Sequence, residues 1–294
     1  MLPPPDGVPG RAADLAASTG DMVDAPDAVN VHVAPVDGGF DPDTVDPGER
    51  GYEGANAGDL GRLAAAVEAV EAVEAACLHH PEPAEGAEGP WLVVEPLAGM
   101  LSTVHAGRGA LAVDLVDPPD GVDAALRVVR GALADVLEAV RPTHGHYPVE
   151  RDEMEVFTRG MTTLAFEGVA TGGDGRGPTV RFEVSTTPDT RAAAVEALVT
   201  GLDPVREARY EPVVEFVRSE PPPSLVRAAE AATEEAVGDW EYEWYPDPTV
   251  FSELPTAEKL ALGTGTPGER TFDRDRYERC RAMIRGTVER HGGA

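Results

Sequence analysis

The sequence of 294 residues almost lacks lysine: Lys259 is the single one, and every other basic residue is an arginine. Its 53 acidic residues against 24 basic ones give a formal net charge of −29 at pH 7. This field repels nucleic acid, so we expect no nucleic-acid partner. The acidic residues are spread along the whole chain, which predicts adaptation to a salt-rich cytoplasm, where screening weakens self-repulsion.

Cysteines and long apolar runs are also scarce. Cys77 and Cys280 are the only two cysteines, without CxxC spacing, which disfavours a disulfide framework and a cysteine-based zinc site. No run of about 18 apolar residues occurs, so we expect no transmembrane helix and no membrane partner. The first residues, MLPPPDGVPGR, lack the basic start and apolar stretch of a signal peptide, which predicts a cytoplasmic location.

The apolar residues that are present, 42% of the chain, are enough for real hydrophobic cores, and the length suggests one large domain or two of ordinary size. Residues 110–219 read as strand, helix, strand, strand, helix, strand, which is the split βαβ or ferredoxin-like pattern. Residues 220–224, EPPPS, predict a stiff linker. The helices and strands expected after this linker resemble those of the first 100 residues more than those of the middle residues. We therefore expect residues 1–109 and 220–294 to form one α/β domain, which the resemblance described below implies to be a reduced catalytic-type domain, into which residues 110–219 are inserted.

Within residues 1–109 and 220–294, the spacing of apolar residues indicates where strands and helices lie. Residues 28–33 and 91–95 read as buried strands, and residues 60–78 read as an amphipathic helix. The segment that follows this helix, HHPEPAEGAEGP, reads as a loop, and its two histidines read as surface residues, like His144 and His146. The final helix is expected from about residue 273, and its arginines are expected to pair with the acidic body of the protein.

Five stretches, in order, carry a resemblance to a known family: HVAPVDGGFDP, GYEGANAGDLGRLAAAV, WLVVEPLAGMLSTVHAGRGAL, TGGDGRGPTVRFEVSTTPDTRAAAVEAL and YPDPTVFSELPTAEKLALGTGTPGERTFDRD. They are similar to the H-x-D-T-V-P-G-G loop, the following helix start, the strand ending in G-E-P, the lid and the H-T-P-D-E segment of the zinc-dependent aminoacylases and metallopeptidases. That family includes acetylornithine deacetylase, succinyl-diaminopimelate desuccinylase and carboxypeptidase G. The resemblance implies a zinc-peptidase-like α/β domain with an inserted ferredoxin-like βαββαβ lid, which usually dimerises.

The resemblance also implies a site with two zinc ions about 3.5–4 Å apart, a bridging water and a carboxylate base. His32 matches the first zinc ligand, and Glu95 matches the ligand of the G-E-P motif. Where the family has an aspartate that orients the first histidine, this chain has Ala34. The bridging aspartate falls at Gly58, which cannot bind metal, and Asp59 is one residue away.

Two further departures affect the chemistry. The final histidine ligand is replaced by Arg270, whose guanidinium has no lone pair to offer a metal, and we hypothesise that Arg270 pairs with Glu95 in its place. The strand and loop that carry the family's paired glutamates are expected to be deleted. Glu82, Glu85 and Glu88 remain in a loop that is too loose to position a base.

These observations predict a degenerate member of the family, without di-zinc hydrolysis and without a cofactor, that acts as a binding or assembly protein. The alternative is an active, metal-dependent amidohydrolase for N-acyl amino acids or small peptides, with zinc at His32, Asp59 and Glu95. We expect a homodimer or hetero-oligomer formed through the lid. The sequence does not name a substrate.

Overall fold

The computed structural model describes residues 2–4, 7–19, 28–33, 51–54, 56–83, 86–96, 101–105, 107–116, 123–124, 126–131, 164–170, 177–186, 196–197, 199–240, 242, 250–254, 256–265 and 270–292. The chain forms two compact units. Unit 1 comprises residues 1–103, 218–242 and 253–294, and unit 2 comprises residues 104–217 and 243–252. Residues 104–217 of unit 2 are therefore inserted into unit 1, at junctions a few residues from 109/110 and 219/220, whereas residues 243–252, which were expected in the outer domain, also belong to unit 2.

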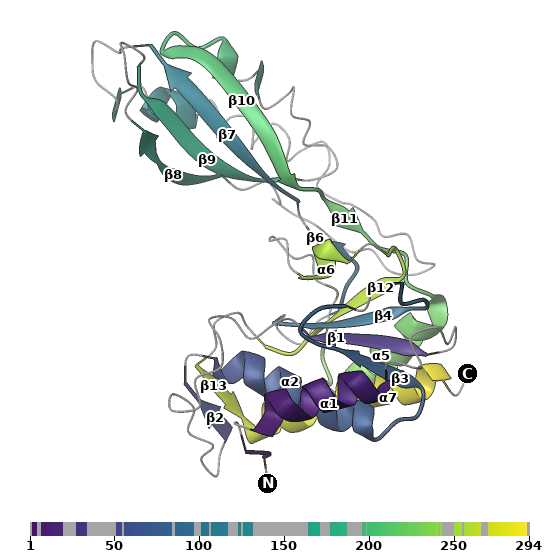
Figure 1. The fold of residues 1–294 in the computed structure, drawn as a ribbon. Coiled ribbons are helices and arrows are strands. Elements are labelled where there is room, and N and C mark those ends of the chain that lie inside the picture. Colours follow the sequence, from purple (N-terminus) through teal and green to yellow (C-terminus); the bar gives the residue numbers. More distant parts are fainter. Residues whose placement is uncertain are drawn as a thin grey trace. The chain divides into compact units, whose positions relative to one another are not determined.

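Unit 1 is built on a five-stranded sheet with the order β3-β1-β4-β12-β5 (Figure 1). Four strands are parallel and β5 is antiparallel to β12. The strands are β1 (Val29–Val33), β3 (Ala76–His79), β4 (Trp91–Glu95), β5 (Leu101–Ser102) and β12 (Lys259–Gly263). The four parallel strands, β1, β3, β4 and β12, are buried along their whole length, as expected for parallel strands.

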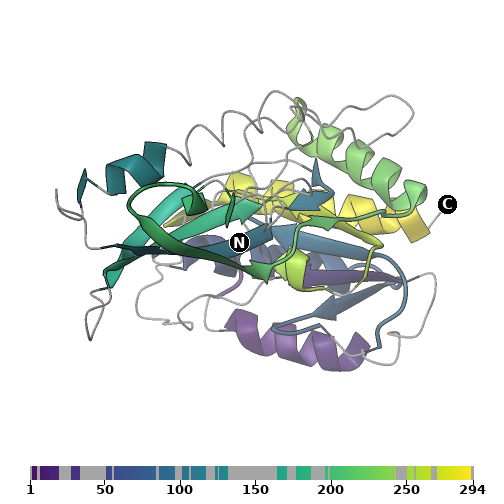
Figure 2. The same ribbon diagram turned by 90° about the horizontal axis from the view of Figure 1, so that it is seen from above.

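One face of this sheet is apolar. Side chains alternate between the two faces of a strand, so the pairing registers place every second residue on the same face. The apolar face carries Val29, Val31, Val33, Ala76, Leu78, Leu92, Val94, Leu101, Leu260 and Leu262, all in the main hydrophobic core. Four helices cover it: α1 (Val8–Thr19), α2 (Ala57–Glu71), α5 (Pro223–Val237) and α7 (Arg274–Gly292) (Figures 1 and 2).

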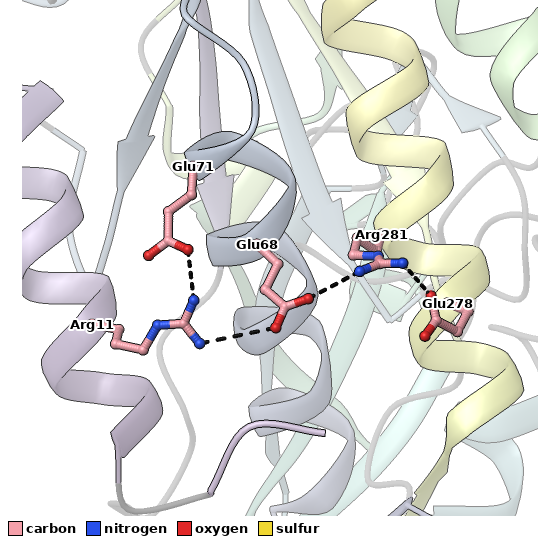
Figure 3. A network of polar contacts seen from close by, with 5 residues as sticks. All are labelled: Arg11, Glu68, Glu71, Glu278 and Arg281. Atoms are coloured by element: carbon pink, nitrogen blue, oxygen red, sulfur yellow. Dashed lines mark hydrogen bonds and ion pairs between the residues drawn. The ribbon is translucent and has the colours of Figure 1, made fainter. Parts of the chain in front are cut away.

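The helices pack side by side in the order α1, α2, α7, α5. A chain of charges crosses three of them on the outer surface (Figure 3). Arg11 of α1 contacts Glu71 at 2.6 Å and Glu68 at 3.9 Å, and both glutamates are on α2. Arg281 of α7 contacts Glu68 at 3.1 Å and also pairs with Glu278. The predicted pairing of the final helix with the acidic body is therefore confirmed for Arg281.

Two short elements stabilise the start of α2. The two-stranded sheet of β2 (Gly51–Glu53) and β13 (Thr271–Asp273) packs on this helix. Phe272 of β13 is fully buried, and its ring lies against the backbone of Gly61 in α2. A side chain at position 61 would occupy the space of that ring, so the close approach requires glycine here.

The structure corrects one expectation for unit 1. The helix predicted for residues 60–78 ends at Glu71, and residues 76–79 form strand β3 at the outer edge of the described sheet. A strand is therefore present between the helix and β4, where the sequence predicted that one was deleted. Residues 8–19 form α1, with Val8 and Ala12 buried in the core.

Unit 2 contains a four-stranded antiparallel sheet with the order β10-β7-β9-β8. Its strands are β7 (Gly107–Leu115), β8 (Leu164–Ala170), β9 (Thr179–Thr186) and β10 (Val205–Val214). Helical residues at 123–124, 126–131, 196–197 and 199–200 include Val129 and Val199, which belong to a second core with this sheet. The strand order is the one expected for a ferredoxin-like βαββαβ sheet.

Three small elements complete the description: β6 (Val104–His105), which pairs with β11 (Val217–Arg218), and α6 (Val250–Glu253). Predicted elements at residues 132–140, 155–163 and 243–245 lie outside the described residues. Within the part of the chain that is described, no helix is both long enough and apolar enough to cross a membrane.

Candidate functional site

The second face of the unit 1 sheet is buried but polar. We define the polar face as Asn30, His32, Cys77, His79, Trp91, Glu95 and Lys259, which the strand registers place together opposite the apolar face. None of these side chains is more than 4% exposed. Buried polar groups in proteins are normally held by defined partners, so their hydrogen bonds show what this face can do.

Hydrogen bonds define the state of two histidines on the polar face. The Asn30 amide nitrogen donates to the Glu88 carbonyl at 2.7 Å, which leaves its Oδ1 to accept from His79 Nε2 at 2.8 Å. His32 Nδ1 lies 3.1 Å from the His79 carbonyl oxygen and therefore donates to it. His32 Nε2 then carries a lone pair, and it makes no hydrogen bond within the described part of the chain.

The surroundings of both histidines favour the neutral imidazole. Burial lowers the pKa of His32 to about 4, although the bond to the His79 carbonyl acts in the opposite direction. Burial also lowers the pKa of His79 to about 4. The His79 ring packs against Trp91 with 4.6 Å between ring centroids. A neutral histidine with one nitrogen bonded to a backbone carbonyl is also the form that binds metal.

Glu95 and Lys259 add one negative and one positive charge to the polar face. They are 1% and 2% exposed. Lys259 Nζ donates to the Leu254 carbonyl at 2.6 Å. Burial lowers the pKa of Lys259 to about 8, and the negative charge of Glu95 opposes this shift. The two groups therefore interact electrostatically, although the strand register places them four residues apart along neighbouring strands.

Asp59, the nearest acid to the expected bridging position, lies in the first turn of α2 and forms an ion pair with Arg62 one turn later. The side chain of Arg62 is 3% exposed and that of Asp59 is 29% exposed. Gly58 is buried beside them and offers no ligand atom. A buried guanidinium in contact with this carboxylate competes with any metal cation for it.

The structure does not bring Arg270 to Glu95. Arg270 is exposed, and its backbone carbonyl accepts a hydrogen bond from the Gly54 N–H beside β2. Glu95 is buried on the polar face, so the hypothesised pairing is not found. Lys259, on the neighbouring strand β12, is the basic residue that shares the polar face with Glu95.

Other candidates are placed as follows. Glu82 and Glu88 are exposed. His79 was expected at the surface and is instead buried on the polar face. Its neighbour His80 is half-buried, and its Nδ1 lies 3.2 Å from the Val33 carbonyl oxygen. Ala34, Glu85, His144 and His146 lie outside the described residues.

The side chains that are described do not fit a pair of zinc ions. No group of three or more histidine, cysteine, aspartate or glutamate side chains among them could hold a metal ion. His32 Nε2 has the lone pair that a ligand needs, but Asp59 is held by Arg62, and Lys259 adds positive charge near Glu95. A bridged pair of zinc ions needs more oxygen and nitrogen ligands than this set offers.

Sequence reasoning missed four members of this arrangement: Asn30, His79, Arg62 and Lys259. A signal for two of them was present. Lys259 is the single lysine and begins an apolar strand, and a charge inside a buried strand is rare unless it has a partner. His79 ends a short apolar run after a helix, which is also a strand pattern. Asn30 and Arg62 could be placed only once the sheet and helix were known.

Comparison with known proteins gives a fold. No protein-family model and no curated protein matches the chain. Among solved structures, the chain is similar to the M20 family metallo-carboxypeptidase Sso-CP2 from Sulfolobus solfataricus, with a TM-score of 0.59, 12% identity, and 98% of this chain and 95% of that chain covered. The aminopeptidase PepT from Bacillus cereus gives a TM-score of 0.57 and 10% identity, covering 97% and 92% of the two chains.

A third similar structure is the di-peptidase Dug1p from Saccharomyces cerevisiae, with a TM-score of 0.55, 14% identity, and 92% of this chain and 81% of that chain covered. All three likenesses extend over both units and almost the whole chain. The protein therefore has the fold of the M20 metallopeptidases.

Proposed function

We propose that this chain uses a metallopeptidase fold without di-zinc hydrolysis and acts as a binding or assembly protein. The observation that carries the proposal is the ion pair between Asp59 and the buried Arg62. The carboxylate that lies nearest to the bridging position is already neutralised by a side chain of the same helix. A bridging carboxylate must instead be available to two metal ions.

Two further observations support the proposal. Glu82 and Glu88, two of the acids that follow β3, are exposed, so neither has the rigid surroundings that a general base needs. Arg270 stands where the family pattern has its last histidine ligand, and its side chain is exposed to solvent. Hydrolysis requires a bridging carboxylate, a general base and a last histidine ligand. We propose that the residues at these three positions do not fill those roles.

One observation favours an alternative function. His32 Nε2 is buried, carries a lone pair and makes no hydrogen bond among the described residues. Leaving such an acceptor unsatisfied costs about 1–3 kcal/mol, and a single metal ion would satisfy it. The alternative is a mononuclear amidohydrolase for N-acyl amino acids or small peptides that uses His32, Glu95 and Asp59.

Metal content separates the two functions. Protein purified in high salt without nickel is given zinc, dialysed, and analysed for zinc per chain by mass spectrometry, alongside His32→Ala. We expect less than stoichiometric zinc in both proteins and no hydrolysis of N-acetyl amino acids or dipeptides. One or more ions per chain in the wild type, lost in His32→Ala and accompanied by hydrolysis, would establish the alternative.

Assembly is proposed to occur through the lid, with a second copy of this chain as the partner. β8 is the outer strand of the described lid sheet, and the N–H and C=O groups on the outer side of such a strand can pair with another strand. Phe166 and Val169 lie on the same face as the core residues Phe182 and Val180, yet they are 43% and 41% exposed. This leaves an apolar margin on the outer strand.

Light scattering after size-exclusion chromatography tests the assembly. We expect the wild type to have the mass of a dimer and Val169→Glu to have the mass of a monomer, because a charge at an apolar contact is costly to bury. Ala170→Glu is the matched control, since position 170 points to the opposite face of the same strand. A wild type that is monomeric at every concentration would overturn the proposed homodimer.

A further inference from the structure

The start of α2 is a buried helix end with N–H groups that the helix itself does not satisfy. The hydrogen bonds of this helix begin at the Leu60 N–H, which donates to the Asn56 carbonyl at 3.0 Å. The first turn has no side-chain cap hydrogen bond, so the N–H groups of Gly58 and Asp59 have no partner within the helix. Gly58 is buried. Such a helix end attracts a negatively charged acceptor, because its N–H groups and its dipole both favour one.

The guanidinium of Arg62 brings an unused donor to the same helix end. The Arg62 side chain is 3% exposed. Side chains in a helix lean toward its N-terminus, and Arg62 Nη2 reaches Asp59 in the first turn. Arg62 Nη1 is buried and makes no hydrogen bond within the part of the chain that the structure describes. A buried, charged donor is costly to leave unmade, so this nitrogen calls for an acceptor from outside the described residues.

The topology places this helix end where α/β proteins bind ligands. The chain runs from β1 through α2 to the parallel strand β3, so α2 begins at the carboxyl edge of the sheet. β3 and β4 lie on opposite sides of β1, so the strand order reverses at this edge. Ligands of open α/β sheets bind outside the carboxyl ends of the strands at such a reversal. The side chain of Asp59, which is 29% exposed, connects this end to solvent.

The charges at this helix end favour a ligand with a single negative charge. Arg62 contributes one positive charge, the start of α2 contributes about half of one, and Asp59 subtracts one. The remaining positive charge balances a monoanion better than a dianion. Among monoanions, a carboxylate has two oxygens that match the N–H groups of a guanidinium and of the backbone, whereas chloride offers no such directional pairing.

Building on the proposed absence of di-zinc hydrolysis, we infer that Arg62 and the start of α2 form a binding site for the carboxylate group of a small molecule. Arg62 Nη1 and the N–H groups of Gly58 and Asp59 donate to this carboxylate, while Nη2 stays on the Asp59 side chain. The site is held on rigid parts of unit 1, because the buried ring of Phe272 packs on Gly61 in the next turn of α2. The inference names a ligand class for the proposed binding function.

Titration with potassium acetate, followed by amide NMR signals, tests the site. The protein is kept in chelator and in a high, constant concentration of potassium chloride, which removes metal and holds the ionic strength nearly fixed. We expect the amide signals of Gly58 and Asp59 to shift and saturate together, while those at the end of α2 stay in place. No saturable shift of these two signals would overturn the inference. Equal shifts from additional chloride would mean an adventitious ion only and would overturn it too.

Two substitutions at the site have opposite expected effects. Arg62→Lys keeps a positive charge beside Asp59 but lacks the planar fork, so acetate should bind at least about tenfold more weakly. Asp59→Asn removes the negative charge that competes for Arg62, so acetate should bind about tenfold more tightly. Asp59 is partly exposed, so Asp59→Asn decides the question even if Arg62→Lys does not fold. An affinity for acetate that Asp59→Asn leaves unchanged would overturn the inference.

Glu68→Gln is the matched control for Asp59→Asn. It also removes one acidic residue from α2, but Glu68 lies on the outer surface and pairs with Arg281 at 3.1 Å. The affinity for acetate should change by less than about twofold, because distant exposed charges are screened at high salt. Equal tightening in Glu68→Gln and Asp59→Asn would show that net charge alone governs anion binding, and the site would be refuted.

Inorganic phosphate is the second probe, and we expect it to bind more weakly than acetate because the site balances a single negative charge. Tighter binding of phosphate would overturn the assignment to a carboxylate. The zinc measurement keeps the inference and the proposed function apart. Stoichiometric zinc in the wild type that is lost in Asp59→Asn, accompanied by hydrolysis, would overturn the proposed function. The absence of acetate binding in zinc-free protein would overturn the inference alone.

Discussion

Acidification from pH 6.5 to pH 4 is expected to lower the free energy of unfolding by several kcal/mol. His32 and His79 are buried on the polar face, and burial lowers the pKa of each from 6.5 to about 4. The unfolded chain therefore binds more protons than the folded chain between these values, so stability falls as the pH falls. Each histidine contributes about 3 kcal/mol at order-of-magnitude precision. This contribution is fully present above pH 6.5 and fully lost below about pH 4.

Denaturant unfolding measured at several pH values, with chelator present, checks this expectation. His32→Asn and His79→Gln retain a donor for the carbonyl or amide partner but cannot take up a proton in this range. The slope of the unfolding free energy against pH gives the number of protons taken up on unfolding. Each substitution should lower this number by about one between pH 4.5 and 6. His80, whose pKa burial also lowers, contributes the remainder. A double variant with the wild-type pH dependence would show that these histidines do not control acid unfolding.

Gly61→Ala is expected to destabilise the protein by about 2 kcal/mol, although alanine is normally the better helix former. A β-carbon at position 61 would lie 2.1 Å from a ring atom of Phe272, which is fully buried. Relieving this overlap requires the buried ring, or α2 and β13 themselves, to shift from their packed positions. Chemical unfolding followed by tryptophan fluorescence measures the change.

Gly10→Ala is the matched control for this substitution. Gly10 also lies within a helix, α1, and a β-carbon there would meet no atom within 4 Å. It should stabilise the protein by about 0.5–1 kcal/mol through helix propensity. Combining Gly61→Ala with Phe272→Leu should recover part of the loss, because a smaller side chain relieves the overlap. If Gly61→Ala raised stability as Gly10→Ala does, the close packing of α2 on β13 would be refuted.

Much of the fold was predictable because apolar periodicity is a local signal. The strands at residues 29–33 and 91–95 and the lid order follow from alternating or continuous apolar runs. Strand β3 was missed because ACLH follows a long helical pattern without a break, so the helix was extended to residue 78. Those residues form a strand because they pair with the edge of β1, an interaction that the local sequence does not show.

The candidate site was less predictable, because it depends on which face of a strand meets which neighbour. His32 and Glu95 could be selected from motif positions, and both lie on the polar face. The residues that surround His32 and Glu95 could not be identified from motif positions. Arg270 has the right sequence position to approach Glu95 but is exposed, whereas Lys259 has no motif and lies on the adjacent strand. Electrostatic partners are decided by register and packing, which one sequence does not display.

The position of β12 in the sheet has a consequence for synthesis on the ribosome. β12 lies between β4 and β5, yet β4 ends at residue 95 and β12 begins at residue 259. Until β12 is made, the edge of β4 that pairs with it is open, and α7, which follows β12 in the chain, has not yet covered its part of the apolar face. The lid, in contrast, is continuous in sequence from β7 to β10 and can fold earlier. The nascent chain thus exposes an unpaired strand edge for the time that about half of the protein takes to be translated, and this interval is when chaperone binding or aggregation would act on it.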